Sequence, residues 1–443
     1  MSRRPIWKTL IERFDPETPV QEKAWRASRS RSPAQVICER LDIPVGIPRV
    51  LVTGTVGTGK TTELYRIAEE RTAKEFVVFV DLERHFSDVV GDAPSLQHIS
   101  SWEVCFLMGV ALLRAAEEQL HFELPKTHSD DLQRAWSALA KVTSSGDSPS
   151  FDVAALAKSM IVLASSALPG AGAPVELGLK VLEKASDSMK WSIPFGRSQR
   201  PMADQERPVQ ALLACVNTII GLVQQRGSRV LLVIDGLDRI RDFSRAKELF
   251  LDSRLISLLD CPMVVCGPFA LRHHPATAAI RGFYDVPPLV NEPVLLKDDP
   301  RQKGPGVAFF RELFDLRSRD LSTGGAVISE AQLDKLAYYS GGRAREFVTF
   351  VRRLAELGWQ KDVDAATDEI IDRVLDERRK HRETGLHTGH IRVLEEIARD
   401  PKHRLPEDPL AQDLLSYGHL LPYPNESEWY YPHPLLLLHL LQV

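Results

Sequence analysis

The pattern of apolar and polar positions changes near residue 300. Before it, four short and almost continuous apolar runs alternate with segments of helical periodicity; the runs lie at residues 49–52, 76–80, 229–234 and 263–266. Such runs are typical of strands buried on both faces, as in parallel sheets. From residue 301 to 383 the periodicity is helical. We therefore predict an α/β fold: a P-loop NTPase parallel sheet core with a helical insertion, then a helical lid and a small winged-helix domain.

The same pattern predicts the domain boundaries. We expect an N-terminal lead-in (residues 1–48) and a nucleotide-binding core (49–296) that contains an insertion (121–206). A helical lid (297–385) and a winged-helix-like domain (386–443) follow. The last domain is predicted from two helices followed by two aromatic-rich strands around a turn. For the insertion, a packing or partner-binding helical hairpin is favoured over a membrane-surface helix. Its apolar stretch, residues 153–168, carries only one cation, Lys158.

The first apolar run leads into a glycine-rich turn with the pattern Gly-x-x-x-x-Gly-Lys-Thr, which is typical of a phosphate-binding loop. Glycines let backbone N–H groups approach phosphate oxygens, and the following helix adds further N–H groups and its dipole. Lys60 is expected to reach the β- and γ-phosphates, and the Thr61 hydroxyl to ligate Mg²⁺. The predicted nucleotide-binding residues are Gly54, Thr55, Val56, Gly57, Thr58, Gly59, Lys60, Thr61, Thr62 and Arg343. An ordinary glycine turn is the alternative interpretation.

A second apolar run ends in Asp235 and is followed by Gly236, Leu237 and Asp238. A carboxylate at the carboxyl end of a buried strand can hold Mg²⁺ beside a phosphate loop. We predict that Asp235 is this metal ligand, together with Thr61, and that Asp238 orients or deprotonates the attacking water. Asp81, at the end of another apolar run, is the alternative ligand.

Three further features bear on catalysis. The strand predicted at residues 263–268 ends where a γ-phosphate sensor is expected but offers no strong hydrogen-bonding side chain. Arg272 and Arg281 follow it, and either is a candidate arginine finger, although ordinary surface arginines are the favoured interpretation. Arg343 and Arg345 lie in the first turn of a predicted helix, where cations oppose the helix dipole. An anion would resolve this conflict, so a phosphate contact is favoured.

Composition narrows the function classes. The 443 residues carry a formal charge of -4, so no overall field marks nucleic acid or an anionic membrane as a partner. Five scattered cysteines without a Cys-x-x-Cys pair are typical of reduced thiols, and we expect a cytoplasmic protein. No apolar run reaches the length of about 20 residues needed to span a bilayer. No secretory signal is predicted at the N-terminus.

The predicted winged helix is a weak candidate for DNA binding. From Leu405 to the end the chain has no Lys or Arg, although DNA-reading elements need cations for phosphates. Packing against protein is therefore favoured. A metal site at His381, His387 and His390 is disfavoured because no Cys or carboxylate stands at ligand spacing.

Together these motifs resemble the AAA+/STAND group of P-loop ATPases. The run ending in Asp-Gly-Leu-Asp resembles the Walker B strand of STAND proteins, and Ser-Gly-Gly-Arg-Ala-Arg-Glu is similar to the sensor-2 turn of AAA+ lids, with Arg345 at the matching arginine. The chain departs from the group in two places: its sensor-1 strand lacks a polar residue, and Asp238 is followed by Arg239 instead of Glu. The resemblance implies ATP-dependent conformational switching or oligomerisation.

From these observations we predict a bacterial, Mg²⁺-dependent ATPase that binds ATP with Lys60, Asp235, Asp238 and Arg345 as its catalytic residues. Adenine is favoured because the Asn-Lys-x-Asp segment that reads guanine does not occur in the sequence. A slow nucleotide-gated switch, for example an antiviral defence sensor, and a DNA-binding regulator are the alternatives. A homo-oligomer or a protein partner is expected through the insertion and the C-terminal module.

Overall fold

The computed structural model describes residues 3–20, 22–122, 124–143, 152–165, 179–182, 195–196, 203–273, 275–321, 326–424 and 428–442. Part of the predicted insertion (residues 121–206) therefore lies outside the described residues. In its described part, the expectation of a helical hairpin is wrong for Val162–Ser165 and Leu179–Leu182, which are strands at the edge of the sheet. The chain divides into two compact units. We call Pro33–Thr53 with Glu63–Pro288 the sheet unit, and Met1–Ser32 with Gly54–Thr62 and Leu289–Val443 the loop unit.

The sheet unit is built around a seven-stranded sheet with the order β4-β3-β2-β5-β6-β1-β7. Its strands are β1 (Arg49–Val52), β2 (Phe76–Asp81), β3 (Val162–Ser165), β4 (Leu179–Leu182), β5 (Val230–Asp235), β6 (Met263–Cys266) and β7 (Tyr284–Asp285). The five strands from β2 to β7 in this order run parallel, and β3 and β4 are added antiparallel at one edge. The predicted α/β fold class with a mostly parallel sheet is confirmed.

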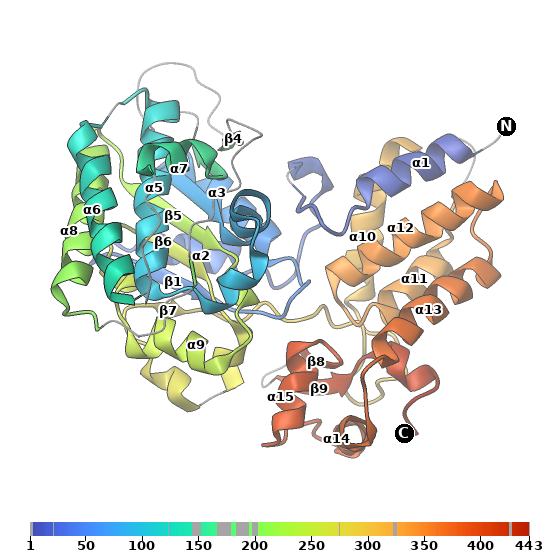
Figure 1. Ribbon diagram of the computed structural model, residues 1–443. Coiled ribbons are helices and arrows are strands. Elements are labelled where there is room, and N and C mark those ends of the chain that lie inside the picture. Colours follow the sequence, from blue (N-terminus) through green and yellow to red (C-terminus); the bar gives the residue numbers. More distant parts are fainter. Residues whose placement is uncertain are drawn as a thin grey trace. The chain divides into compact units, whose positions relative to one another are not determined.

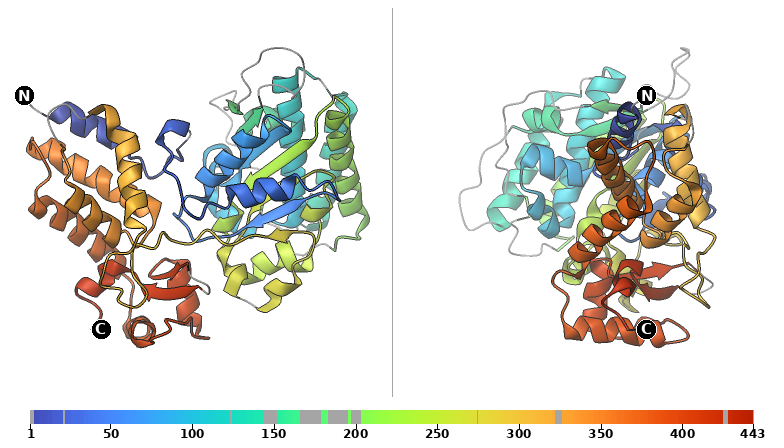
Figure 2. Two further views of the ribbon diagram at one scale, coloured as in Figure 1. Left: turned by 180° about the vertical axis from the view of Figure 1, so that it is seen from behind. Right: turned by 90° about the vertical axis from the view of Figure 1, so that its right-hand side faces the viewer.

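Helices cover both faces of this sheet (Figures 1 and 2). The helices of the sheet unit are α2 (Ala34–Leu41), α3 (Lys60–Arg71), α4 (Leu82–Arg84), α5 (Ser101–Leu120), α6 (Lys126–Thr143), α7 (Val153–Ser159), α8 (Arg207–Gln224) and α9 (Phe243–Lys247), of which α3 begins in the last residues of the loop unit. Helices α2 and α3 pack on one face, and α5 and α8 on the other.

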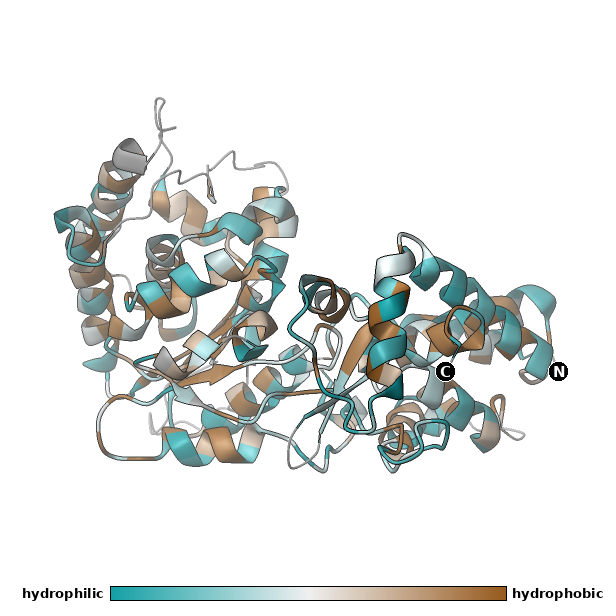
Figure 3. Cartoon of the chain, turned by 90° about the horizontal axis from the view of Figure 1, so that it is seen from below, coloured by the Kyte–Doolittle hydropathy of each residue, from teal (hydrophilic) through white to brown (hydrophobic). Residues whose placement is uncertain are grey.

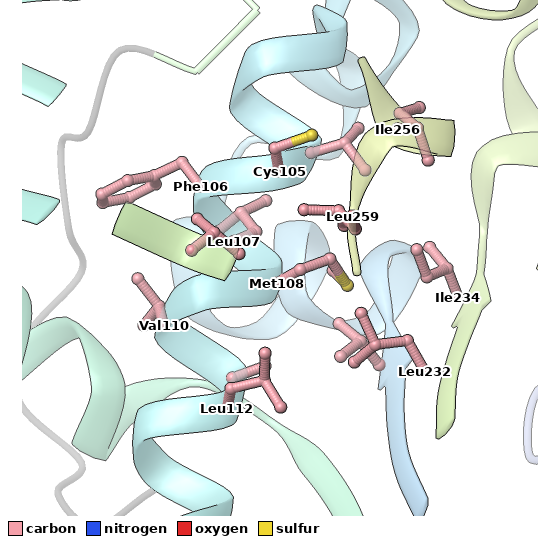
Figure 4. Packing of buried hydrophobic residues seen from close by; sticks show 14 of the residues in the cluster. Cys105, Phe106, Leu107, Met108, Val110, Leu112, Leu232, Ile234, Ile256 and Leu259 are labelled. Carbon is pink, nitrogen blue, oxygen red and sulfur yellow. The ribbon is translucent and has the colours of Figure 1, made fainter. Parts of the chain in front are cut away.

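Alternate residues of each strand enter the two cores, as the pleat requires. On β5, Leu232 and Ile234 face α5, whereas Leu231 and Val233 belong to the core under α2 and α3. Figure 4 shows side chains of α5, including Met108, packed with Leu232 and Ile234. Because both faces are covered, β2 and β5 are apolar up to the aspartate that ends each strand, and brown colouring marks apolar residues of the central sheet in Figure 3.

The loop unit is mainly helical. Its helices are α1 (Arg4–Arg13), α10 (Val307–Ser318), α11 (Glu330–Tyr339), α12 (Ala344–Lys361), α13 (Asp368–Glu383), α14 (Thr388–Arg399) and α15 (Pro409–Ser416). Helix α1 packs so closely on α12 that a Cβ on Gly358 would come within 2.7 Å of the Trp7 indole. The Trp7 indole N–H also donates to the Val363 carbonyl at 2.8 Å. The start of the chain is thus part of the same core as the helices after residue 300.

The C-terminal part of the loop unit has the predicted order of elements. Helices α14 and α15 are followed by an antiparallel hairpin of β8 (Leu420–Tyr423) and β9 (Trp429–Pro432). The Tyr423 hydroxyl donates to the Gly341 carbonyl at 3.0 Å, so the hairpin is fastened to the turn before α12. Among the described residues, no helix combines the length and the apolar character needed to cross a membrane.

Candidate nucleotide-binding site

The glycine-rich turn, residues 54–59, connects β1 to α3, and Lys60 is the first residue of that helix. Gly57 and Gly59 have φ values of +88° and +96°, in the left-handed region that favours glycine. Gly54 is needed for a different reason, since a Cβ there would come within 2.3 Å of the Leu289 carbonyl oxygen. Within the described part of the chain, the backbone N–H groups of Val56, Gly57 and Gly59 donate to no protein acceptor. Successive N–H groups in this kind of turn form an anion-binding nest.

The carbonyl groups of the turn are bound by the protein. The buried Lys60 ammonium donates to the carbonyls of Gly54 and Thr55 at 2.9 and 2.7 Å. The Thr58 hydroxyl donates to the Thr55 carbonyl at 2.8 Å. Lys60 therefore lies against the inner side of the loop. Its predicted partners are the phosphates of a nucleotide bound to this loop. Thr61 and Thr62 follow it in the first turn of α3 and are half-buried.

The two arginines predicted to contact phosphate also meet this loop. The Arg343 guanidinium donates to the Val56 carbonyl from Nε and Nη2, at 3.1 and 2.5 Å, and the Arg345 backbone N–H donates to the Gly57 carbonyl at 3.0 Å. Loss of hydration lowers the pKa of Arg343 to about 10, and the nearby Arg382 contributes, so the side chain is charged at neutral pH. Part of the conflict between these cations and the α12 dipole is thus resolved by loop carbonyls. A phosphate role for either residue stays a prediction.

A third arginine, which the motif analysis did not single out, reaches the loop from the N-terminal segment. The Arg29 guanidinium donates to the Thr58 carbonyl and to the Glu292 carboxylate, the latter at 2.6 Å. It also lies over the Phe309 ring, 4.7 Å from the centroid. Only 6% of the Arg29 side chain and 10% of the Glu292 side chain are exposed. Arg29 belongs to the Arg/Ser run at residues 26–32, for which the sequence favoured a solvated entry segment over a contact with nucleotide or nucleic acid. For Arg29 the expectation of a solvated side chain is wrong, because the side chain is buried against Glu292 and Phe309.

The segment that begins at Leu289, where the chain returns to the loop unit, makes further contacts with the loop. Leu289 forms a parallel bridge with Gly54, and the Thr55 hydroxyl donates to the Asn291 side chain at 3.3 Å. Asn291 is buried, and its amide donates to the Pro422 carbonyl of β8 at 3.0 Å. Asn291 and Glu292 interrupt an apolar run, which is the signal by which sequence analysis could have found them.

In the sheet unit, Asp235 is the last residue of β5, as predicted. Ligand atoms of Asp235, Asp238 and Cys266 all lie within 4.8 Å of one another. Oxygen atoms of two carboxylates suit a hard cation such as Mg²⁺. Gly236 directs the chain away from the strand with a φ of +96°, and a Cβ there would come within 2.7 Å of the Glu83 backbone nitrogen. Sequence analysis missed Cys266, the last residue of β6, because it searched that position for a polar residue.

The alternative metal ligand, Asp81, lies beside Asp235 in the parallel register of β2 and β5. Its carboxylate accepts a hydrogen bond from the Arg84 N–H at 3.0 Å and so caps α4. Burial raises the pKa of Asp81, and the Glu83 carboxylate adds to this. Glu83 in turn pairs with Arg239. Asp81 therefore has a local structural role at this edge of the sheet.

The remaining candidates are more dispersed. Arg272 lies in the 3-10 turn Phe269–His273, and Arg281 is exposed. Among the described residues, His381, His387 and His390 do not form a cluster with metal-ligand geometry. His387 instead caps α14, its ring accepting from the Gly389 N–H at 3.2 Å. The magnesium site predicted between Thr61 and Asp235 joins residues of the two units and stays a prediction.

Comparison with known proteins gives a limited result. No protein-family model and no curated protein matches the chain. Among solved structures, the chain is similar to the Aeropyrum pernix ORC2 protein in ADPNP–ADP complexes, with 11% identity, a TM-score of 0.39, and coverage of 98% of this chain and 94% of that one. It is similar to the Aeropyrum pernix ORC1 protein in complex with DNA, with 10% identity, a TM-score of 0.40, and coverage of 97% and 93%. It is also similar to the Thermotoga maritima RuvB Holliday junction branch migration motor, with 13% identity, a TM-score of 0.26, and coverage of 53% of this chain and 84% of that one. The TM-scores are low, so the function proposed below depends on the residues of this chain.

Proposed function

We propose that this chain binds Mg·ATP at residues 54–61 and uses the nucleotide state to switch its conformation or assembly, as a P-loop ATPase of the AAA+/STAND type. The observation that carries the proposal is the turn itself. Its two left-handed glycines and the start of α3 arrange backbone N–H groups, and those of Val56, Gly57 and Gly59 donate to no acceptor among the described residues. Its carbonyls are bound from the other side. Such an arrangement favours an anion with several oxygen atoms.

In this proposal the side chains have separate roles. Lys60 neutralises the β- and γ-phosphates, Thr61 and Asp235 hold Mg²⁺, and Asp238 orients the attacking water. Arg345 senses the γ-phosphate. When bound, Mg²⁺ neutralises charge on the phosphates and the leaving oxygen. The carboxylate of Asp235 supplies the hard oxygen donor that Mg²⁺ prefers, and Asp238 lies beside it.

Two versions of this function differ in rate. In the first, the protein hydrolyses ATP steadily and cycles as a motor or assembly factor. In the second, it is a slow switch that keeps its nucleotide until a trigger or a protein partner arrives. Steady-state turnover of the purified protein, together with the nucleotide that co-purifies with it, separates them. Brisk hydrolysis supports the first version, and bound ADP with negligible turnover supports the second.

The central test is nucleotide binding by a Lys60→Ala variant, followed with the fluorescence of mant-ATP. We expect a loss of affinity of at least about 100-fold, because the variant removes a charge-assisted contact from a buried site. Lys8→Ala is the matched control, since Lys8 is an exposed lysine of α1, 71% exposed, and should leave the affinity unchanged. Wild-type affinity in Lys60→Ala would refute the assignment of the loop.

A further inference from the structure

The phosphate loop has two sides with different partners. Each carbonyl from residue 54 to residue 58 accepts a hydrogen bond from the protein; the donors are Lys60 for Gly54 and Thr55, Arg343 for Val56, the Arg345 backbone for Gly57 and Arg29 for Thr58. Of these donors, Arg29 alone precedes the loop in the sequence. Its acceptor is the last carbonyl before the glycine that leads into α3.

The bond from Arg29 fixes the orientation of one peptide group. In a trans peptide the C=O and the following N–H point in opposite directions. Arg29 binds the Thr58 carbonyl, so the Gly59 N–H is directed to the opposite side of the loop. A Cβ on Gly59 would lie 3.0 Å from Arg29 Nη2, which shows how closely the guanidinium approaches this turn.

Arg29 is itself held on several sides. Its guanidinium forms a short ion pair with Glu292 at 2.6 Å and stacks over Phe309. The Glu292 backbone N–H donates to the Gly342 carbonyl at 2.9 Å, directly before α12. A guanidinium that is almost fully buried and paired with a carboxylate is held in one orientation. The position of the Thr58–Gly59 peptide therefore depends on Arg29 and on the segment around Glu292.

We propose that Arg29 is a positioning residue of the nucleotide site. It keeps the Gly59 N–H directed at the phosphates by holding the Thr58 carbonyl, and it does not contact the phosphates itself. This inference rests on the proposed function of the loop. It makes the N-terminal segment a necessary part of the site, although this segment lies outside the motif.

The test compares dissociation constants of mant-ATP and mant-ADP for Arg29→Ala, Arg29→Lys and wild type. Arg29→Ala should weaken both nucleotides equally, by about tenfold, which is the usual effect of losing one hydrogen bond from a charged group. Arg29→Lys should recover part of this loss, because an ammonium can still donate to the Thr58 carbonyl. Arg31→Ala is the matched control, since Arg31 belongs to the same Arg/Ser run and is exposed.

A second measurement excludes a purely structural effect. A residue that only stabilises the fold would lower the unfolding midpoint of the nucleotide-free protein and leave the dissociation constants at 20 °C unchanged, and that outcome overturns the proposal. A loss confined to mant-ATP also overturns it, because that result assigns Arg29 to the γ-phosphate. If Arg29→Ala does not fold, Arg29→Lys and Glu292→Gln replace it, and wild-type constants in both overturn the proposal. If wild type itself binds neither nucleotide, the function proposed for the loop fails instead.

Discussion

The phosphate loop and the carboxylate cluster at the end of β5 both follow a buried strand, but they are held in place differently. The loop carbonyls are bound by Lys60, which directly follows the loop, and by Arg29 and Arg343, which come from distant parts of the sequence. At the end of β5, the Asp235 carboxylate accepts the N–H of the next residue, Gly236, at 2.8 Å. The loop thus has contacts from distant parts of the sequence, whereas this bond at the strand end joins two adjacent residues. Substitutions at residues far along the sequence should therefore disturb the structure of the loop more than that of the strand end.

The largest effect is expected at Gly342, in the turn that supports the loop. This residue has a φ of +80°, and a Cβ would come within 2.1 Å of the Glu292 carbonyl oxygen. Gly342→Ala should lower the free energy of unfolding by about 3 kcal/mol through strain and displacement of Glu292. Urea unfolding measures this change.

Gly227→Ala is the control for this variant. Gly227 also has a positive φ, of +109°, but no atom lies within 4 Å of the added Cβ. Its substitution should cost about 1 kcal/mol, from backbone strain alone. Equal losses in the two variants would show that the contact with Glu292 does not support the loop.

The next effect tests the strand end. Asp235→Asn should lower Mg²⁺-dependent ATP turnover by about 10- to 100-fold, the usual cost of altering a group that orients a metal ion through water. Asp81→Asn is the matched control, since an Asn side chain can still cap α4. Turnover at saturating ATP measures both variants. The reverse ranking would assign the metal to Asp81.

A smaller effect concerns the pH dependence of stability. Burial lowers the pKa of His85, which follows β2, to about 4, whereas Arg343 beside the loop stays charged. Between pH 6.5 and pH 4 the unfolded chain therefore binds a proton that the folded chain does not, so acidification favours unfolding. The free energy of unfolding should fall by about 1 kcal/mol from pH 6 to pH 5 through this group.

His85→Leu should remove this part of the pH dependence, because it replaces a titrating ring with an apolar side chain of similar size. Urea unfolding at both pH values measures the difference. An unchanged slope in His85→Leu would show that other groups cause the acid sensitivity.

The smallest effect is expected at Cys266. Mg²⁺ prefers oxygen ligands and a thiolate prefers softer ions, so Cys266→Ser should change Mg²⁺-dependent turnover by less than about threefold. The same variant should be inhibited less by Zn²⁺ than wild type. A large loss of Mg²⁺-dependent turnover would show that the thiol has a direct part in catalysis.

Local patterns allowed much of the fold to be predicted from the sequence. The continuous apolar runs identified β1, β2, β5 and β6, because strands covered on both faces have no polar positions. Gly54, Gly57 and Gly59 were expected to allow positive φ in the turn; Gly57 and Gly59 have it, whereas Gly54 does not.

The contacts that hold the loop could not be predicted in this way. Arg29 and Asn291 contact the loop, and Glu292 contacts Arg29, only in the three-dimensional fold, and no local sequence pattern predicts these contacts. The same holds for Cys266, whose neighbours depend on the order of strands in the sheet. The helix α1 was not predicted either, since its core contacts are with α12, far along the chain.

The bond between Arg29 and the Thr58 carbonyl has a practical consequence for dissecting the molecule. A fragment that begins at Pro33 keeps every residue of the glycine-rich motif and all seven strands of the large sheet, and a motif search would score it as complete. It would nevertheless lack the guanidinium that orients the last peptide of the turn. Truncation series of this chain should therefore start before the Arg/Ser run, and inactivity of a shorter fragment would say nothing against the motif.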